Sequence, residues 1–170
     1  MKRILLSAAI AMMLLVSSAS AQTAPVRVWI SSGVVISGSR YIEMGVGLSG
    51  QLAVEKRPHH VSARAIIFGD VGGFPDSGGG DGVGEAGLVY GRMITGVFGQ
   101  AFVAAGLSAI QFEGCPGTQE DSCGSLGVPI VAQAGINSRI VGFAVQGFAN
   151  VNPKSIYGGI SIVLQLGWMP

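Results

Sequence analysis

Charged residues are scarce in this sequence of 170 residues. Only 11% of them are Asp, Glu, Lys or Arg, whereas an ordinary soluble domain has roughly 25%. Hydrophobic residues account for 49% of the chain, and no stripe of basic residues indicates a nucleic-acid partner. The chain therefore has few charges with which to cover a water-facing surface, and we expect no nucleic-acid binding.

Histidine is almost absent, which restricts the catalytic and metal sites that the chain could form. The only two histidines are His59 and His60, in the basic segment KRPHH. Adjacent residues of a strand point to opposite faces, so the pair makes a poor chelate without a third ligand. We interpret the pair as part of a solvated turn, and we predict no metal, no cofactor and no catalytic residue.

The N-terminal segment has the three-part pattern of a secretory signal peptide. A basic start precedes an apolar stretch over residues 4–16, and a run of small residues ends at Ala21. The apolar stretch is shorter than the roughly 20 residues that span a bilayer, which disfavours an uncleaved anchor. We predict that residues 1–21 are a cleaved signal peptide and that residues 22–170 form one domain.

Cysteine occurs only twice, at Cys115 and Cys123, within the polar segment GCPGTQEDSCGS. An exported protein meets an oxidising compartment, where two cysteines of one turn-rich loop can pair. A metal site would need more ligands than the nearby carboxylates supply, and no histidine is in reach. We therefore predict a disulfide bond that closes this loop.

Glycine is abundant instead, with 28 residues that all follow the signal segment. Glycine destabilises helices but is tolerated in turns, bulges and tightly bent strands. Between the glycine-rich and polar breaks, apolar residues alternate with small or polar ones, which is the period of a strand. We expect eight strands, over residues 26–37, 41–55, 61–69, 85–93, 96–112, 127–137, 141–151 and 157–170.

The links between these strands differ in length in a regular way. The odd-numbered links include the long glycine loop and the cysteine loop, whereas the even-numbered links are the short segments KRPHH, ITG and SRI. An up-and-down barrel places odd links at one rim and even links at the other. Outer-membrane barrels have short periplasmic turns and longer external loops. The pattern predicts an all-β, eight-stranded antiparallel up-and-down transmembrane β-barrel.

The apolar and polar faces of the strands distinguish two solvents. A membrane barrel is apolar outside and polar inside, whereas a soluble barrel has the opposite arrangement. The polar faces here consist mostly of Gly, Ser, Gln and Asn, which suit the narrow interior of an eight-stranded barrel. A secreted or periplasmic soluble barrel that binds a small apolar ligand is the alternative. A membrane helix over the uncharged residues 93–112 is disfavoured by their glycines and by the period of two in the neighbouring segments.

Particular charged and aromatic residues have predicted places in this barrel. Glu43 and Arg64 lie on neighbouring strands, where an internal ion pair and two unrelated rim charges both fit, because register cannot be read from sequence. Aromatic residues near strand ends suit the interfacial belts of a membrane protein. The aromatic residues that we assign to these belts are Trp29, Tyr41, Tyr157 and Trp168.

The last segment, YGGISIVLQLGWMP, alternates strictly and has no charge on its apolar face. In this it resembles the small eight-stranded outer-membrane β-barrels of Gram-negative bacteria, the OmpA-like and OmpW-like group, over residues 26–170. Such proteins end with alternating apolar residues and a terminal aromatic, usually Phe, which the barrel assembly machinery reads. Here Met169 and Pro170 follow the aromatic residue. The resemblance implies an assembly signal at Tyr157, Ile160, Ile162, Leu164, Leu166 and Trp168.

Motifs of the lipid A-modifying barrel enzymes are not found. The deacylase type has a His on a late strand, but this chain has none after His60. The palmitoyltransferase type has its His at the external rim, opposite to the rim predicted for the histidine pair. GVGEAG at 82–87 leaves a loop and enters a strand, unlike a dinucleotide fingerprint, and Asp76 and Asp81 lack the rest of a calcium-loop pattern. We therefore predict a structural or interaction protein of the outer membrane, without a wide pore, in contact with membrane lipid, lipopolysaccharide and an unidentified external partner.

Overall fold

Eight β-strands form a closed barrel in a computed structural model that describes residues 26–39, 44–70, 82–95, 99–113, 115 and 122–168. Each strand pairs with its neighbours in the chain, and β1 also pairs with β8. All eight pairings are antiparallel, which confirms the predicted up-and-down barrel. The strands are β1 (Arg27–Ser39), β2 (Gly45–Lys56), β3 (His59–Asp70), β4 (Gly82–Thr95), β5 (Gln100–Glu113), β6 (Ser122–Asn137), β7 (Val141–Val151) and β8 (Ile156–Trp168).

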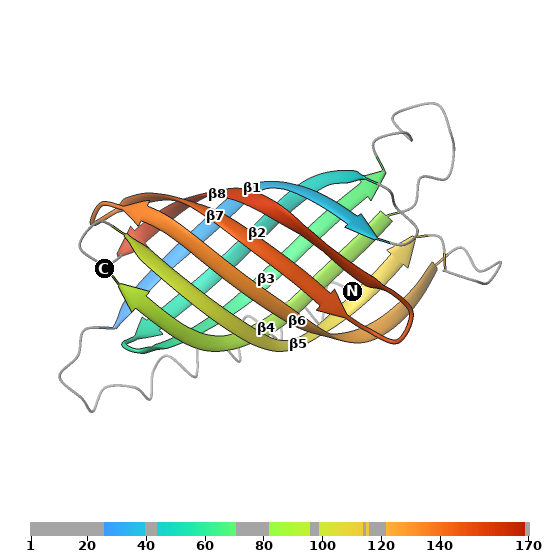
Figure 1. The fold of residues 1–170 in the computed structure, drawn as a ribbon, viewed down its shortest axis with the longest axis horizontal. Coiled ribbons are helices and arrows are strands. Elements are labelled where there is room, and N and C mark those ends of the chain that lie inside the picture. The colour runs from blue at the N-terminus through green and yellow to red at the C-terminus, as the bar shows by residue number, and fades with distance from the viewer. Residues whose placement is uncertain are drawn as a thin grey trace.

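The two rims of the barrel differ in the length of their connections. In Figure 1 the arrowheads of β2, β4, β6 and β8 lie at the end where the C-terminus is marked, and those of β1, β3, β5 and β7 lie at the opposite end. The β2–β3 and β6–β7 connections at the first end contain residues 57–58 and 138–140, and we call it the short-turn rim. The opposite end, called the long-loop rim, is where residues 71–81 and 114–121 connect strands. The asymmetry agrees with the link lengths in the sequence.

One predicted turn differs from the structure. His59 and His60 were expected in the turn after β2, but that turn contains only Arg57 and Pro58, and β3 begins at His59. The prediction was wrong because the antiparallel ladder continues to Lys56 opposite His59. A two-residue connection is enough to join antiparallel strands, so the histidines become strand residues.

Apolar side chains face outward on all eight strands. On β8, Ile160, Ile162 and Leu164 are exposed, whereas Ser161 and Val163 between them are buried. Soluble monomers rarely expose a contiguous apolar patch of more than a few hundred Å², yet here the apolar rows surround the barrel. The alternative of a soluble barrel requires these rows inside, and the structure places them outside.

The interior contains aromatic and polar side chains together, with no uniform apolar core. Period-two alternation turns the residues between the outward apolar positions toward the lumen. Burial is complete or nearly so for Ser62 of β3, Asn150 of β7 and Gln165 of β8. The buried large apolar side chains include Trp29, Ile66, Phe68, Val89, Phe102, Val131, Phe148 and Tyr157.

Pro129 interrupts the ladder between β5 and β6. The paired residues pass from Ala105 opposite Ile130 to Ser108 opposite Gly127. Proline has no backbone N–H to donate to a ladder. The sequence pattern placed this proline near the beginning of its strand, but β6 begins seven residues earlier, at Ser122, because the chain re-enters the sheet on the N-terminal side of the proline.

Candidate functional site

An ion pair lies inside the barrel between Arg64 of β3 and Glu85 of β4. Arg64 Nη2 is 3.8 Å from Glu85 Oε2, and both side chains are almost completely buried. The register places Arg64 opposite Gly87 and Glu85 opposite Ile66, so the two charges are diagonal neighbours on the lumenal face. Diagonal neighbours of adjacent strands are within reach of long side chains.

Two further side chains join this ion pair to the opposite wall of the barrel. The Tyr157 hydroxyl of β8 donates a hydrogen bond of 2.7 Å to Glu85 Oε2. The Arg64 guanidinium lies over the Phe148 ring of β7, with the guanidinium carbon 5.1 Å from the ring centroid, which is a cation–π contact. Since β7 and β8 lie across the lumen from β3 and β4, these four side chains span the interior.

A second bridge across the lumen consists of glutamines. Gln146 of β7 donates through Nε2 to Gln51 Oε1 of β2 at 2.9 Å and to Gln133 Oε1 of β6 at 3.1 Å. Gln51 Nε2 in turn donates to Ser62 Oγ of β3 at 2.8 Å. Four strands are therefore connected through buried side-chain amides, whose burial without partners would be costly.

His60 is part of an aromatic layer between these glutamines and the short-turn rim. Its ring is stacked on Phe102 of β5, with centroids 4.0 Å apart, and the Trp29 ring centroid lies 5.6 Å away. His60 Nε2 is 3.1 Å from Ser62 Oγ. The side chain is fully buried, so it packs inside the lumen and is inaccessible to a substrate at either rim.

One buried carboxylate forms ion pairs with two arginines at the short-turn rim. Glu55 of β2 is fully buried, and its Oε1 lies 3.7 Å from Arg27 Nη1 and 3.2 Å from Arg57 Nε. Arg57 comes from the β2–β3 turn and donates a hydrogen bond to the same oxygen. These groups hold the N-terminal end of β1 and the turn after β2 together.

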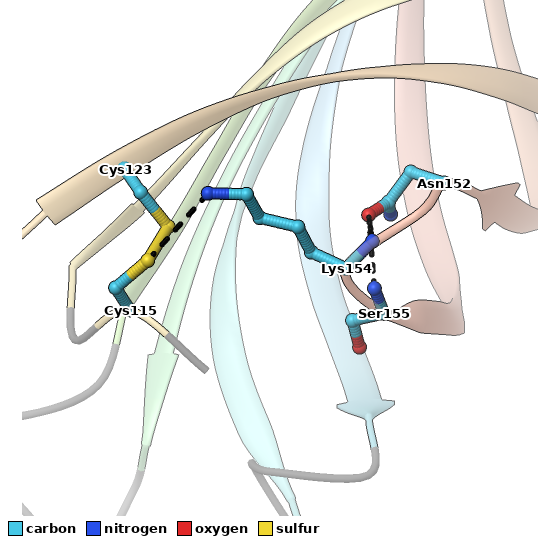
Figure 2. Close-up of a disulfide and its surroundings, with 5 residues drawn as sticks. All are labelled: Cys115, Cys123, Asn152, Lys154 and Ser155. Carbon is cyan, nitrogen blue, oxygen red and sulfur yellow. Dashed lines mark hydrogen bonds between the residues drawn. A yellow bond between two sulfur atoms is a disulfide. The ribbon is translucent and has the colours of Figure 1, made fainter. Parts of the chain in front are cut away.

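The predicted disulfide bond is present at the long-loop rim. Cys115 follows β5 and Cys123 lies in β6, with Cα atoms 5.5 Å apart. Cys123 is opposite Phe112 in the ladder, so the bond ties two strand ends together and only Cys115 lies in a loop. Figure 2 shows Lys154 reaching the disulfide from the β7–β8 connection, with Nζ 3.6 Å from Cys115 Sγ.

The connection that carries Lys154 has its own side-chain cap. Asn152 Oδ1 accepts hydrogen bonds from the backbone N–H groups of Lys154 at 3.1 Å and Ser155 at 3.0 Å, as Figure 2 shows. Asparagine side chains commonly stabilise tight turns in this way. The cap orients Lys154 toward the disulfide, so two of the connections at the long-loop rim are in contact.

A glycine makes room for a hydrogen bond between two strands in the part of the interior next to the long-loop rim. Asn150 of β7 donates through Nδ2 to Ser108 Oγ of β5 at 2.8 Å. Gly127 of β6 lies between them, and a Cβ at this position would be 2.7 Å from Ile110 Cδ1 and would overlap Asn150 Oδ1. The missing side chain therefore makes room for the bridge between β5 and β7.

The four predicted interfacial aromatics have different positions. Trp29 and Tyr157 are each only 1% exposed, so their assignment to a lipid-facing belt is wrong. Both belong to the lumenal set of their strand, because Trp29 alternates with the outward Val28. Trp168 is 76% exposed, and its interfacial role stays a prediction. Tyr41 lies outside the described residues.

The residues of the predicted assembly signal lie on both faces of β8. Tyr157 points into the lumen, and the other members of the set point outward. Recognition of this strand by an assembly factor stays a prediction. The outward members are Ile160, Ile162, Leu164, Leu166 and Trp168.

The other candidate motifs do not form a binding site within the described residues. The GVGEAG segment is part of β4 and is followed by more strand, unlike a dinucleotide-binding turn. Within the described ranges, no three His, Cys, Asp or Glu residues are grouped to hold a metal ion. The calcium candidates Asp76 and Asp81 fall outside these ranges. Glu43 does too, and the described partner of Arg64 is Glu85.

Among the described residues, no helix is long and apolar enough to cross a membrane.

The sequence did not predict the cross-lumen contacts of Glu85, Gln51 and Phe148. These positions alternate with the outward apolar residues of each strand, and this alternation indicates that their side chains point into the lumen. Their partners depend on strand register and on which walls face each other.

Comparison with known proteins gives matches in structure only. No protein-family model matches the chain, and no curated protein matches it in sequence. The barrel is similar to the crystal structure of Neisserial surface protein A (NspA), with a TM-score of 0.62 and 10% sequence identity, over 86% of this chain and 100% of that one.

The attachment invasion locus protein Ail of Yersinia pestis is similar as well. Its crystal structure matches with a TM-score of 0.57 and 10% identity, over 86% of this chain and 99% of that one. The structure of Ail in complex with the heparin analogue sucrose octasulfate matches with a TM-score of 0.54 and 11% identity, over the same shares. With its closed barrel of eight antiparallel strands and its apolar exterior, the chain has the fold of the small eight-stranded outer-membrane β-barrels.

Proposed function

We propose that the protein is a structural or interaction protein of the bacterial outer membrane, embedded by its barrel. The observation that carries this proposal is the outward orientation of apolar side chains on every strand. Burial of apolar surface contributes roughly 25 cal/mol per Å² of free energy. Contact of the apolar exterior with hydrocarbon is therefore favourable, and its contact with water is unfavourable. The fold shared with NspA and Ail supports the same location.

We also propose a route of export and a topology, which the sequence pattern and the two rims support. Residues 1–21 direct the chain across the inner membrane as a signal peptide and are removed, and residues 22–170 are the barrel domain. The short-turn rim faces the periplasm and the long-loop rim faces outside, as in other barrels of this kind. The strand β8 is the segment that the barrel assembly machinery reads.

The lumen is proposed to be closed and without catalytic activity. Eight-stranded barrels are just wide enough for side chains to fill, and the contacts of Tyr157 with Glu85 and of Gln146 with Gln51 extend from wall to wall. His60 is enclosed by aromatic rings. These contacts support a barrel without a wide pore, and they favour it over a lipid A-modifying enzyme.

The long-loop rim is proposed as the surface that meets external partners and lipopolysaccharide. This rim contains a rigid element at the base of its loops, formed by the disulfide bond between Cys115 and Cys123 and by the contact of Lys154 with that bond. Binding residues are commonly placed on loops that a rigid scaffold positions. The partner proposed for this rim is an external macromolecule or glycan.

Fractionation tests this proposal directly. We expect the protein, expressed in a Gram-negative host, to stay in the outer-membrane pellet after high-salt washing and to require detergent for extraction. Its band on a denaturing gel should shift between unheated and boiled samples, because a folded barrel resists cold detergent. Recovery in the soluble periplasmic fraction would contradict the proposal. A protease added to intact cells should cut only in the long loops, and cleavage at the short-turn rim would contradict the topology.

A further inference from the structure

A row of basic side chains crosses three strands on the outer face near the short-turn rim. Lys56 of β2 is opposite His59 of β3, and His59 is opposite Arg92 of β4. His59 and Arg92 are exposed, and Lys56 is partly exposed. All three occupy the positions that elsewhere on these strands hold outward apolar residues, so this row interrupts the apolar exterior.

The spacing of the row suits a single phosphate group. Adjacent strands are about 4.8 Å apart, so the three side chains leave the barrel within roughly 10 Å of one another. Lysine and arginine have long side chains whose apolar stems lie along a surface while the charged head turns toward water. A phosphate accepts charge-assisted hydrogen bonds from both, and arginine can bind it through two parallel N–H groups.

His59 is oriented by a neighbouring tyrosine. Its Nδ1 lies 2.7 Å from the Tyr90 hydroxyl, and the two rings are stacked with centroids 5.9 Å apart. When the hydroxyl donates to Nδ1, the proton of the neutral imidazole is on Nε2, which then donates to an acceptor beside Lys56 and Arg92. Tyrosine at this depth also suits the boundary between hydrocarbon and headgroups.

The positive charge of this row is not balanced by the described acidic residues. The described salt bridges join Arg27, Arg57 and Arg64 to carboxylates inside the barrel. Of the other described acids, Asp70 and Glu113 are the last residues of β3 and β5, at the long-loop rim. Lys56 and Arg92 therefore have no acidic partner among the described residues.

The row is also continuous with the surface that faces lipid. Val61 is the next outward residue after His59 on β3 and is exposed, and Val103, opposite Arg92, is exposed on β5. A soluble anion would fit the charge alone. A phosphate group attached to acyl chains fits both the charge and the adjoining apolar rows.

We propose that Lys56, His59 and Arg92 form a binding site for the phosphate group of an anionic glycerophospholipid whose acyl chains lie along the outer apolar surface of β3 to β5. This inference rests on the proposed function, because it requires the exterior to be embedded in lipid. At the short-turn rim the lipid belongs to the periplasmic leaflet. Each Lys or Arg near an anionic headgroup strengthens binding by about fivefold.

Native mass spectrometry of the full protein purified in a zwitterionic detergent tests the site. Phosphatidylglycerol and phosphatidylethanolamine are added at equal concentration, and the adducts that remain on the folded barrel are counted. We expect phosphatidylglycerol to be retained about 25-fold more than phosphatidylethanolamine, from about fivefold for each of Lys56 and Arg92. The preference should disappear in Lys56→Gln/Arg92→Gln and persist in Arg139→Gln, which removes a positive charge from an exposed turn of the same rim.

Two additional variants keep the test decisive. Lys56→Arg/Arg92→Lys retains both charges and should retain the preference, and Lys56→Gln alone should lower it by about fivefold if the double variant does not fold. Equal retention of both lipids by the natural protein, or an equal loss in the Arg139→Gln control, would overturn the proposal. Displacement of phosphatidylglycerol by an equal concentration of inorganic phosphate would also overturn it, because the acyl chains would then contribute nothing to binding.

The outcome is separable from that of the proposed function. If the protein is absent from the outer-membrane fraction, the membrane location fails and this site fails with it. If the protein is in that fraction and shifts on heating but has no preference for phosphatidylglycerol, only the lipid site is wrong.

Discussion

Arg64 Nη2 lies 3.8 Å from Glu85 Oε2, and the same carboxylate oxygen accepts the hydrogen bond of the Tyr157 hydroxyl at 2.7 Å. One oxygen atom thus connects β3, β4 and β8 inside the barrel. No guanidinium nitrogen of Arg64 has a hydrogen-bond partner among the described residues, so the positive charge depends on Glu85 and on the Phe148 ring. The stability of the barrel should be sensitive to this carboxylate.

Glu85→Ala should lower the free energy of unfolding by about 3 kcal/mol, because it leaves the Arg64 charge buried without a partner. Urea titration of the barrel in lipid vesicles, followed by tryptophan fluorescence, measures the change. In Arg64→Met/Glu85→Gln both charges are removed, and the loss should fall below about 1.5 kcal/mol. A double variant that is as unstable as Glu85→Ala would show that the side-chain shapes, and not the ion pair, determine the stability.

Ile162→Arg should destabilise the embedded barrel by about 2–4 kcal/mol, because it places a charge on the outer face in the middle of β8. Val151→Arg, at the end of β7, is the matched control and should cost no more than about 1 kcal/mol, since the cost falls toward the interface. Unfolding free energies in vesicles measure both. Equal and small effects at the two positions would argue against a hydrocarbon layer around the barrel.

Removal of the disulfide bond should loosen the long-loop rim and leave the barrel folded. The bond closes a segment with a sequence separation of 8, for which the chain-entropy model gives at most about 2–3 kcal/mol. In Cys115→Ser/Cys123→Ser, a glutamate-specific protease should cut at Glu120 several-fold faster than in the oxidised protein. The heat-dependent gel shift serves as the control for the barrel. If the cleavage rates are equal, the bond does not restrain this rim.

Trp168→Ala should reduce the amount of assembled barrel in the outer membrane several-fold, because it removes the last outward aromatic residue of the predicted assembly signal. Trp168→Phe keeps an aromatic ring and should restore assembly. The fraction of heat-shifting protein in the membrane pellet measures the effect. Purified Trp168→Ala refolded without assembly factors should regain the barrel, and a failure to refold would mean that the residue is needed for stability itself.

The strands, their number and the contrast between the two rims could be predicted from the sequence. Period-two alternation identifies strands and their faces, and segment spacing gives the link lengths. The same parity places Trp29 and Tyr157 on the lumenal faces of their strands. Both alternate with outward apolar residues, and the structure buries them, so their position near a strand end was a weaker signal than their parity.

The interior contacts could not be predicted, because they depend on register and on closure. A shift of one residue in the ladder would exchange the faces of a strand, and the pairing of Arg64 with Glu85 requires the diagonal relation set by β3 and β4. Contacts such as Gln146 with Gln51 also require the knowledge of which walls face each other. Local sequence contains neither kind of information.

The pairing of β1 with β8 has a consequence for how the chain reaches its final state. The backbone groups of β1 on one side find their partners only in residues 157–168, so the sheet keeps two open edges until the last residues arrive. Contacts between such distant parts of a chain form slowly, and unpaired strand edges invite pairing with other chains. On the proposed route of export, we expect the chain to cross the periplasm unfolded and bound to chaperones, with closure of the barrel as the last step of its folding.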